Sequence, residues 1–265
     1  MSDNKLLPDV IDSASNAIQS IVPETAKETD GALSSVVGFF NNVVLYPVKK
    51  ANLTFKYKLE LFENDLKEKT KNIPKENLQI PPLMLTGPTL EALRYTYDEA
   101  ELRNMYENLL ASAMDNRISD AVHPAYVDAI KQMSPLDAKI LSVIVNHRQL
   151  RCAEIIFQLK NSNKVYLDAM PKNFVQELFD LGDPFVVSSS LSNLNRLSLI
   201  DIKDVPLIGI DYNELLEHPY VHQRELIYKE NKQPFEIKIN EHAITLNDYG
   251  KIFSDVCLRI NDEVK

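Results

Sequence analysis

The chain has 265 residues and a formal net charge of −9, and its composition excludes several common classes of protein. Hydrophobic residues make up 45% and charged residues 25% of the sequence, as is usual for a soluble globular protein. Only six glycines occur, and we find no glycine-rich phosphate loop, dinucleotide-binding fingerprint or nucleophile elbow. The negative charge disfavours an electrostatic attraction of the whole chain to nucleic acid.

The two cysteines, Cys152 and Cys257, are far apart in the sequence and follow no metal-binding spacing. The first residues lack the basic and apolar segments of a secretion signal. We therefore expect a cytoplasmic protein with both thiols reduced. The length suits one large domain or two smaller ones.

The first 75 residues contain an apolar helical pattern followed by a basic one. Residues 1–31 predict a short helix or a poorly ordered segment. Apolar residues recur at helical spacing in 32–47, but this pattern is too short for the ~20 residues that cross a membrane. Pro47 then begins a second helical pattern, and residues 47–75 contain eight lysines against four acidic residues.

This pair of patterns has two interpretations. The helices can form a hairpin whose apolar faces pack together while the lysines face water. They can also bind a membrane surface, because a basic amphipathic helix is typical of peripheral membrane proteins. The predicted membrane or partner face consists of Val36, Phe39, Phe40, Lys49, Lys50 and Lys56.

A proline-rich segment, residues 72–88, predicts an extended linker after the hairpin of 32–75. Pro88 then fits the first turn of a helix, with Thr86 or Gly87 as its cap. This linker belongs to a helical domain that we expect over residues 32–133.

A further helix is predicted to begin at Asp98, with Glu101 completing a capping box. Apolar residues then keep one helical face from Leu102 to Met114, which is the strongest periodic signal in the chain.

Residues 134–265 predict helices and strands in alternation. Ser134 caps a first helix, "LRCAEIIFQLKNS" suggests a second, and residues 185–196 form a third that leads into the strand-like "LSLIDIK". The segments "FEIKI" and "AIT" suggest two strands, and Thr245 with Asp248 suggests the cap of a last helix. This order is typical of a winged helix-turn-helix, with an insertion around 205–232.

The sequence therefore predicts a mainly α fold of the α+β class. An N-terminal helical region precedes a C-terminal winged-helix-like domain that carries a small antiparallel sheet.

Several phrases of the sequence closely resemble the Abi-alpha family of bacterial proteins. They are "PPLMLTGPTLEALRYTYDEAELRNMYENLLASAMD", "VHPAYVDAIKQMSPLDAKIL", "SLSNLNRLSLI" and "LNDYGKIFSDVC". The resemblance covers roughly residues 32–260 and is most specific from Pro81 to Leu141. It implies a setting in abortive infection, in which an infected bacterium stops growing or dies before the phage multiplies. It supplies no catalytic motif.

Asp115, Asp120 and His123 lie in a short polar break between two helical patterns. A carboxylate and imidazole group of this kind can bind a metal or transfer protons when its members converge. The same residue types also satisfy free backbone groups at helix ends. We interpret these three residues as a structural helix junction.

Other chemical groups give weaker signals. His218 and His222 are four residues apart, but Pro219 lies between them and interrupts the helical spacing of a metal pair. Cys257 has core spacing, whereas Cys152 is expected at a helix start, where a thiolate is favoured. We expect no metal, no cofactor and no enzymatic activity.

The third predicted helix of the winged-helix-like domain offers groups that can read DNA. The predicted nucleic-acid or partner contacts are Ser190, Asn193, Asn195 and Arg196. Duplex DNA binding needs several lysine or arginine contacts to phosphate, and this segment has one arginine. The expected function is therefore a non-enzymatic interaction protein in phage defence, with a host or phage protein, or a second copy, as partner. A DNA-binding regulator and a metal-dependent enzyme that uses His218 and His222 are the alternatives, and the interaction protein itself can also associate with a membrane surface through residues 32–75.

Overall fold

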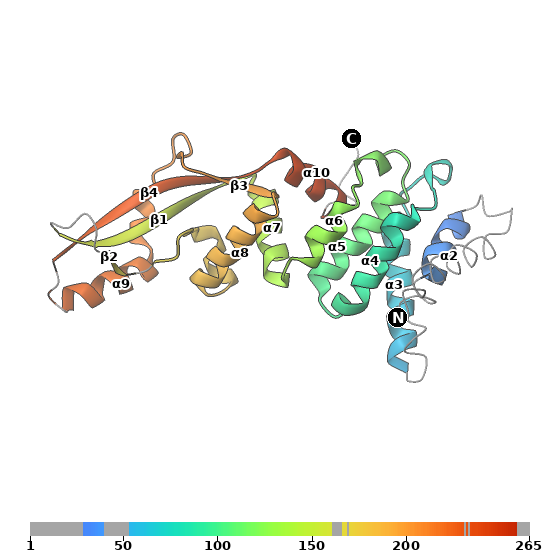
Figure 1. Ribbon diagram of the computed structural model, residues 1–265, viewed down its shortest axis with the longest axis horizontal. Helices are drawn as coiled ribbons and strands as arrows, with labels where there is room; N and C mark the ends of the chain where they lie inside the picture. Colours follow the sequence, from blue (N-terminus) through green and yellow to red (C-terminus); the bar gives the residue numbers. More distant parts are fainter. Residues whose placement is uncertain are drawn as a thin grey trace, which may run out of the picture. The chain divides into compact units, whose positions relative to one another are not determined.

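The computed structural model describes residues 29–39, 53–160, 166–168, 170–230, 232 and 234–258. Within these residues the chain is mainly helical with one antiparallel sheet, which confirms the predicted fold class (Figure 1). Its contacts divide it into two compact units. The first unit holds the described residues up to Lys131 and those from Asp255, and the second runs from Gln132 to Ser254.

The first unit consists of helices grouped around α5. Helices α3, α4 and α6 all contact α5, so its buried surface extends well beyond one apolar stripe. Its elements are α2 (Thr29–Phe39), α3 (Leu53–Thr70), the 3-10 helix η3 (Lys75–Asn77), α4 (Leu83–Thr96), α5 (Ala100–Ala113), the 3-10 helix η4 (Ser119–Ala121), α6 (Ala125–Lys131) and the end of α10 (Asp248–Cys257).

The start of α5 differs from the prediction, although its apolar face is confirmed. Glu99 stands at the N-cap and makes no side-chain cap hydrogen bond. Asp98 instead accepts a hydrogen bond from Lys58 Nζ at 3.0 Å, so the predicted capping box with Glu101 is wrong. The ion pair with Lys58 of α3 uses the Asp98 carboxylate, which the local sequence pattern assigned to the cap of α5.

Helix α4 begins at Leu83, so the predicted cap at Thr86 or Gly87 is wrong and Pro88 lies inside the helix. A proline there removes one backbone hydrogen bond. Burial of Leu90 and Leu93, both at 0% exposure, offsets that loss, because each buried leucine contributes about 1.5–3 kcal/mol.

The segment before α4 is partly held by the end of α5. The Gln79 amide donates to the Met114 carbonyl at 2.8 Å, and the Asn116 amide donates to the Asn77 carbonyl at 2.9 Å. The predicted extended linker of 72–88 is therefore extended only in part, since it contains η3 and the first turns of α4.

The second unit combines helices with a four-stranded antiparallel sheet in the order β2-β1-β4-β3. Strands β1 and β4 pair along eleven residues, from Gln149 opposite Thr245 to Leu159 opposite Phe235. The elements are α7 (Pro135–His147), β1 (Gln149–Leu159), β2 (Tyr166–Asp168), the 3-10 helix η5 (Gln176–Leu181), α8 (Pro184–Arg196), β3 (Ile200–Lys203), the 3-10 helix η6 (Asn213–Glu217), α9 (Pro219–Glu230), β4 (Phe235–Leu246) and α10 up to Ser254.

Two predictions of strands and helices in this unit are wrong. The segment expected as a second helix is the strand β1, and the two strands expected in 235–245 are one continuous strand, β4. A short apolar run such as Ile155 to Phe157 fits either a helix or a strand by spacing alone. The long pairing with β4 makes this segment a strand. The sequence of neither strand alone predicts that pairing.

In the second unit, side chains cap the N-termini of the helices α7, α8 and α10. Ser134 forms the predicted capping box with Asp137, with hydrogen bonds of 3.1 Å and 2.7 Å. Asp183 caps α8 ahead of a proline at its first position. The predicted Thr245 cap of α10 is wrong: Thr245 belongs to β4, and Asn247 Oδ1 accepts from the Gly250 amide at 2.9 Å.

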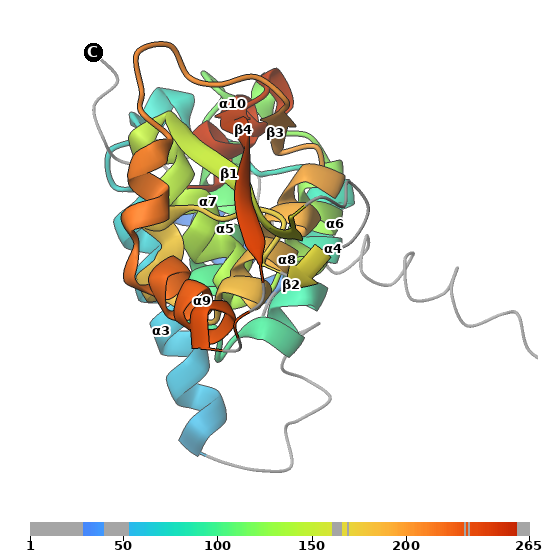
Figure 2. The same ribbon diagram turned by 90° about the vertical axis from the view of Figure 1, so that its left-hand side faces the viewer.

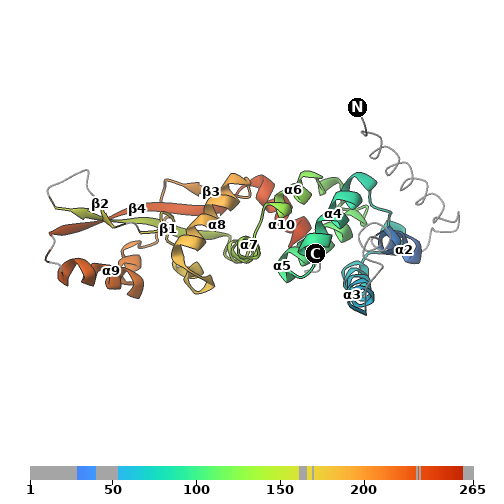
Figure 3. The same ribbon diagram turned by 60° about the horizontal axis from the view of Figure 1, so that its bottom comes forward.

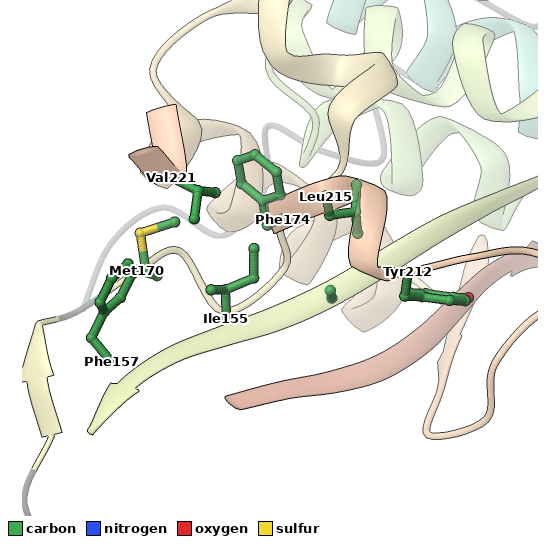
Figure 4. Packing of buried hydrophobic residues seen from close by; sticks show 8 residues of the cluster. Ile155, Phe157, Met170, Phe174, Tyr212, Leu215 and Val221 are labelled. Carbon is green, nitrogen blue, oxygen red and sulfur yellow. The ribbon is translucent and has the colours of Figure 1, made fainter. Parts of the chain in front are cut away.

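The insertion between β3 and β4 supplies part of a hydrophobic core on one face of the long strand pair (Figure 4). Figure 2 and Figure 3 show α9 beside the strand pair, and Val221 of α9 belongs to this core. The buried members are Ala153, Ile155, Phe157, Met170, Phe174, Tyr212, Leu215 and Val221.

A close backbone contact joins α10 to the residue before β3. A Cβ atom on Gly250 would lie 1.8 Å from the Leu199 carbonyl oxygen and 2.7 Å from its carbonyl carbon. No side chain fits there without moving the backbone, so glycine is required by close approach.

Candidate interaction site

Asp115 is buried at a helix junction, where its carboxylate is held by its neighbour. It accepts hydrogen bonds from the Arg117 amide at 3.0 Å and from Arg117 Nε at 2.8 Å. Burial opposes ionisation, but the hydrogen bonds from Arg117 outweigh it and lower the pKa of Asp115. The carboxylate thus stabilises the turn after α5, which itself is tied to residues 77–79.

The other two residues of this group are exposed and do not converge on Asp115. His123 Nδ1 accepts a hydrogen bond from the Ala125 amide at 3.1 Å, at the start of α6. Asp120 lies in the 3-10 helix η4 and is exposed. The structure therefore places Asp120 and His123 in the connection from α5 to α6, without bringing the three side chains into one site.

Three of the four predicted recognition residues on α8 are buried or hydrogen-bonded within the second unit. Ser190 is buried, and Asn193 Nδ2 donates to the Gln132 carbonyl at 2.9 Å and to Asp137 Oδ2 at 3.0 Å. Arg196 donates to Asn193 Oδ1 at 2.8 Å and to the Gln132 side chain at 3.0 Å. Asn195 is exposed.

The proposed membrane or partner face of the first helices is only partly described. Val36 of α2 is buried, at 2% exposure. Phe39 ends α2 and Lys56 lies in α3, but their side chains, like Phe40, Lys49 and Lys50, are outside the described residues. None of the helices in the described ranges is long and apolar enough to cross a membrane.

The remaining chemical candidates are two histidines and the two cysteines. His218 rests edge-on against Phe179, with ring centroids 4.4 Å apart, and His222 Nε2 lies 3.3 Å from Glu217 Oε2. Cys152 lies in β1 and not at a helix start, which corrects the prediction, and burial raises its pKa to about 12. Cys257 is fully buried, and burial raises its pKa too. Among the described residues, no group of three potential metal ligands forms.

A buried polar cluster that the sequence did not reveal lies between α3 and α5. Lys69 Nζ of α3 donates to Asn108 Oδ1 at 2.7 Å and also contacts Asn104. Glu107 is 2% exposed, and its Oε1 lies 3.7 Å from Arg103 Nε without a hydrogen-bond partner. This cluster places charged groups inside a helical core, where an unpaired carboxylate is costly.

Glu107 is consequently a weak acid for a carboxyl group. Burial is the main cause, the nearby Asp65 carboxylate adds to it, and together they raise the pKa of Glu107 to about 7. Burial likewise lowers the pKa of Lys69. Glu107 lies outside the apolar stripe of α5, and its charged neighbours Asp65 and Lys69 come from α3.

The most exposed apolar segment of the described chain is the loop that follows β3, which we call the 205–210 loop. Val205 is 54% exposed, Ile208 is fully exposed and Ile210 is 46% exposed. Figure 1 shows this segment, in orange, leaving the sheet after β3. Exposed apolar groups gathered on one short loop are a mark of an interaction surface.

Hydrogen bonds fix both ends of this loop to the strands below. The Tyr212 hydroxyl accepts from the Leu207 amide at 3.1 Å and donates to the His242 carbonyl at 2.7 Å. Arg151 Nη1 donates to the Asp211 carbonyl at 2.8 Å. Gly209 has a φ of 77°, which favours glycine at the turn. The loop therefore has a fixed conformation that does not depend on a core of its own.

The chain belongs to the abortive infection alpha family, whose model matches residues 54–257. The match includes α5, α8, the 205–210 loop and α10, and it confirms the resemblance noted in the sequence. The comparison with curated proteins found no match. The comparison with solved structures found none either.

Proposed function

We propose that this chain is a non-enzymatic protein of abortive infection that acts in the cytoplasm through contacts with another protein. The family match supports the biological setting. The observation that carries the mode of action is the 205–210 loop, which holds its apolar side chains in water in a fixed conformation. The fully exposed Ile208 gains about 1.5–3 kcal/mol when a partner buries it, and the half-exposed Val205 and Ile210 gain less.

A winged-helix DNA-binding protein is the second candidate. The chain order α7, β1, β2, η5, α8, β3, η6, α9, β4 favours it, because η5 and α8 stand where a helix-turn-helix has its two helices and the paired strands β3 and β4 follow them. Asn193 and Arg196 would have to leave their contacts with Gln132 to reach DNA. This candidate predicts a salt-sensitive gel shift of a mixed-sequence duplex that weakens in the double variant Asn193→Ala, Arg196→Ala.

Membrane association of residues 32–75 fits the structure less well. Phe62 and Leu66 of α3 are fully buried, and Lys69 is held by α5. Moving α3 to a bilayer would break its packing against α5 and the hydrogen bond from Lys69 to Asn108. The helix is thus better explained as part of the first unit.

A phage plating assay tests the proposed function. Bacteria that express the full chain should give fewer plaques with at least one member of a phage panel, and infected cells should fail to recover. Bacteria that express a Gly250→Trp chain, which cannot keep the contact with Leu199, serve as the control without a folded second unit. Equal plaque counts with both chains across the panel would refute the proposal.

A further inference from the structure

The charges around the 205–210 loop are mainly acidic. Asp204 and Asp211 flank it directly, and Glu214 follows in η6. Asp204 Oδ1 lies 3.0 Å from His242 Nδ1, with its side chain 92% exposed, so the carboxylate faces solvent. Two cations are also near: Lys203 ends β3, and Arg151 is bound by Glu214 Oε2 at 2.7 Å. The loop thus presents an apolar tip above a base with a surplus of carboxylates.

This charge pattern separates the kinds of surface that the loop can meet. An anionic membrane and the phosphates of nucleic acid both attract lysine and arginine, and carboxylates beside the contact oppose binding to either. A protein surface with lysine or arginine around an apolar pocket is complementary to the loop. The apolar groups of the two surfaces bury each other, and the basic residues of the rim face the carboxylates beside the loop.

The rigidity of the loop adds to this argument. Leu207 is anchored to Tyr212, Asp211 is anchored to Arg151, and the Asp211 side chain accepts from the Asn213 amide at 2.8 Å. A loop that is already ordered loses little conformational entropy when it binds. The most exposed apolar side chain of the loop, Ile208, can then act as the anchor in a pocket.

We propose that the 205–210 loop inserts Ile208 into an apolar pocket of a protein partner whose rim carries lysine or arginine. This inference rests on the proposed function and specifies the chemistry of the partner. Removing an isoleucine from such a pocket removes about 1.5–3 kcal/mol, so Ile208→Ser should weaken binding about 10- to 100-fold. Because Ile208 is fully exposed, the variant should unfold at the same denaturant concentration as the original chain.

Photo-crosslinking in cells tests this inference with the full chain. A benzophenone amino acid replaces Ile208, and in a matched variant it replaces Leu226 of α9, which is 56% exposed in the same unit. We expect an adduct with one protein at position 208, in infected or uninfected cells, and none with that protein at 226. The adduct should disappear when Asp204 and Asp211 are both changed to lysine, and peptide mapping should place the crosslink beside basic residues.

Several results would overturn the inference. They are an adduct of the chain with itself, an adduct that persists in the double lysine variant, and a crosslink mapped to an acidic surface. Sedimentation of the chain with phosphatidylcholine vesicles, with or without phosphatidylserine, that is lost in Ile208→Ser would assign the loop to lipid instead.

The plating assay separates a failure of this inference from a failure of the proposed function. If the full chain protects bacteria and Ile208→Ser protects equally well, the loop has no such role although the function stands. If the full chain never protects, the function itself is wrong. Leu226→Ser is the matched control and should protect as the original chain does.

Discussion

The two units of the chain use their interiors differently. The first unit buries charged and amide side chains between α3 and α5, with Lys69 and Glu107 at the centre. The second unit buries aromatic and aliphatic groups against β1 and places apolar residues in water at the 205–210 loop. This contrast teaches that the stability of the first unit should follow pH, whereas that of the second should follow close packing.

Gly250→Ala should show the largest effect, because it strikes the packing of the second unit. The added Cβ would lie 1.8 Å from the Leu199 carbonyl oxygen, so the backbone must move. We expect a loss of more than about 3 kcal/mol in the free energy of unfolding, measured by urea unfolding with circular dichroism. Gly38→Ala is the control: a Cβ there meets nothing within 4 Å, and alanine should stabilise α2 by about 0.5–1 kcal/mol. Equal effects of the two changes would refute the packing argument.

Glu107→Gln should remove the part of the first unit's pH dependence that Glu107 causes. Below pH 4.5, the ordinary pKa of glutamate, the carboxyl group is protonated in both folded and unfolded chains. Between pH 4.5 and about 7 the folded chain keeps its proton and the unfolded chain loses it, so stability falls as pH rises. At pH 8 the variant should be more stable than the original chain by about 2 kcal/mol, since the buried negative charge of Glu107 is removed.

Urea unfolding at pH 5 and pH 8 measures this difference. Glu91→Gln provides the matched control, because Glu91 is exposed on α4 and its charge costs the folded state little. The cluster argument fails if Glu107→Gln and Glu91→Gln respond to pH in the same way.

Ser134→Ala tests a smaller contribution in the second unit. The change removes the hydrogen bond from the Asp137 amide to Ser134 Oγ and should cost about 1 kcal/mol. Ser192→Ala, on the exposed side of α8, deletes only a bond to the Ser188 carbonyl within its own helix and should change stability by less than about 0.5 kcal/mol. A Ser134→Ala chain as stable as the Ser192→Ala chain would show that the cap contributes nothing.

The sequence predicted best where structure is local. The capping box at Ser134, the helix over 185–196 and the apolar face of α5 depend on neighbours in the chain, and all three are present. Strand β1 was missed because its pairing with β4 joins residues about 90 positions apart. Glu107 was missed for a related reason, since its neighbours Asp65 and Lys69 belong to another helix, about 40 positions earlier in the chain. The 205–210 loop was read only as part of an insertion, although five apolar residues around one glycine were a readable signal.

The burial of the two cysteines has a practical consequence, because one lies in each unit. Cys152 is in the second unit and Cys257 is in the first, and both are fully shielded from solvent. A thiol reagent can reach either sulfur only when the surrounding structure opens. Mass spectrometry can measure the labelling rates of the two cysteines separately. These rates therefore report how readily each unit opens, without any change to the sequence.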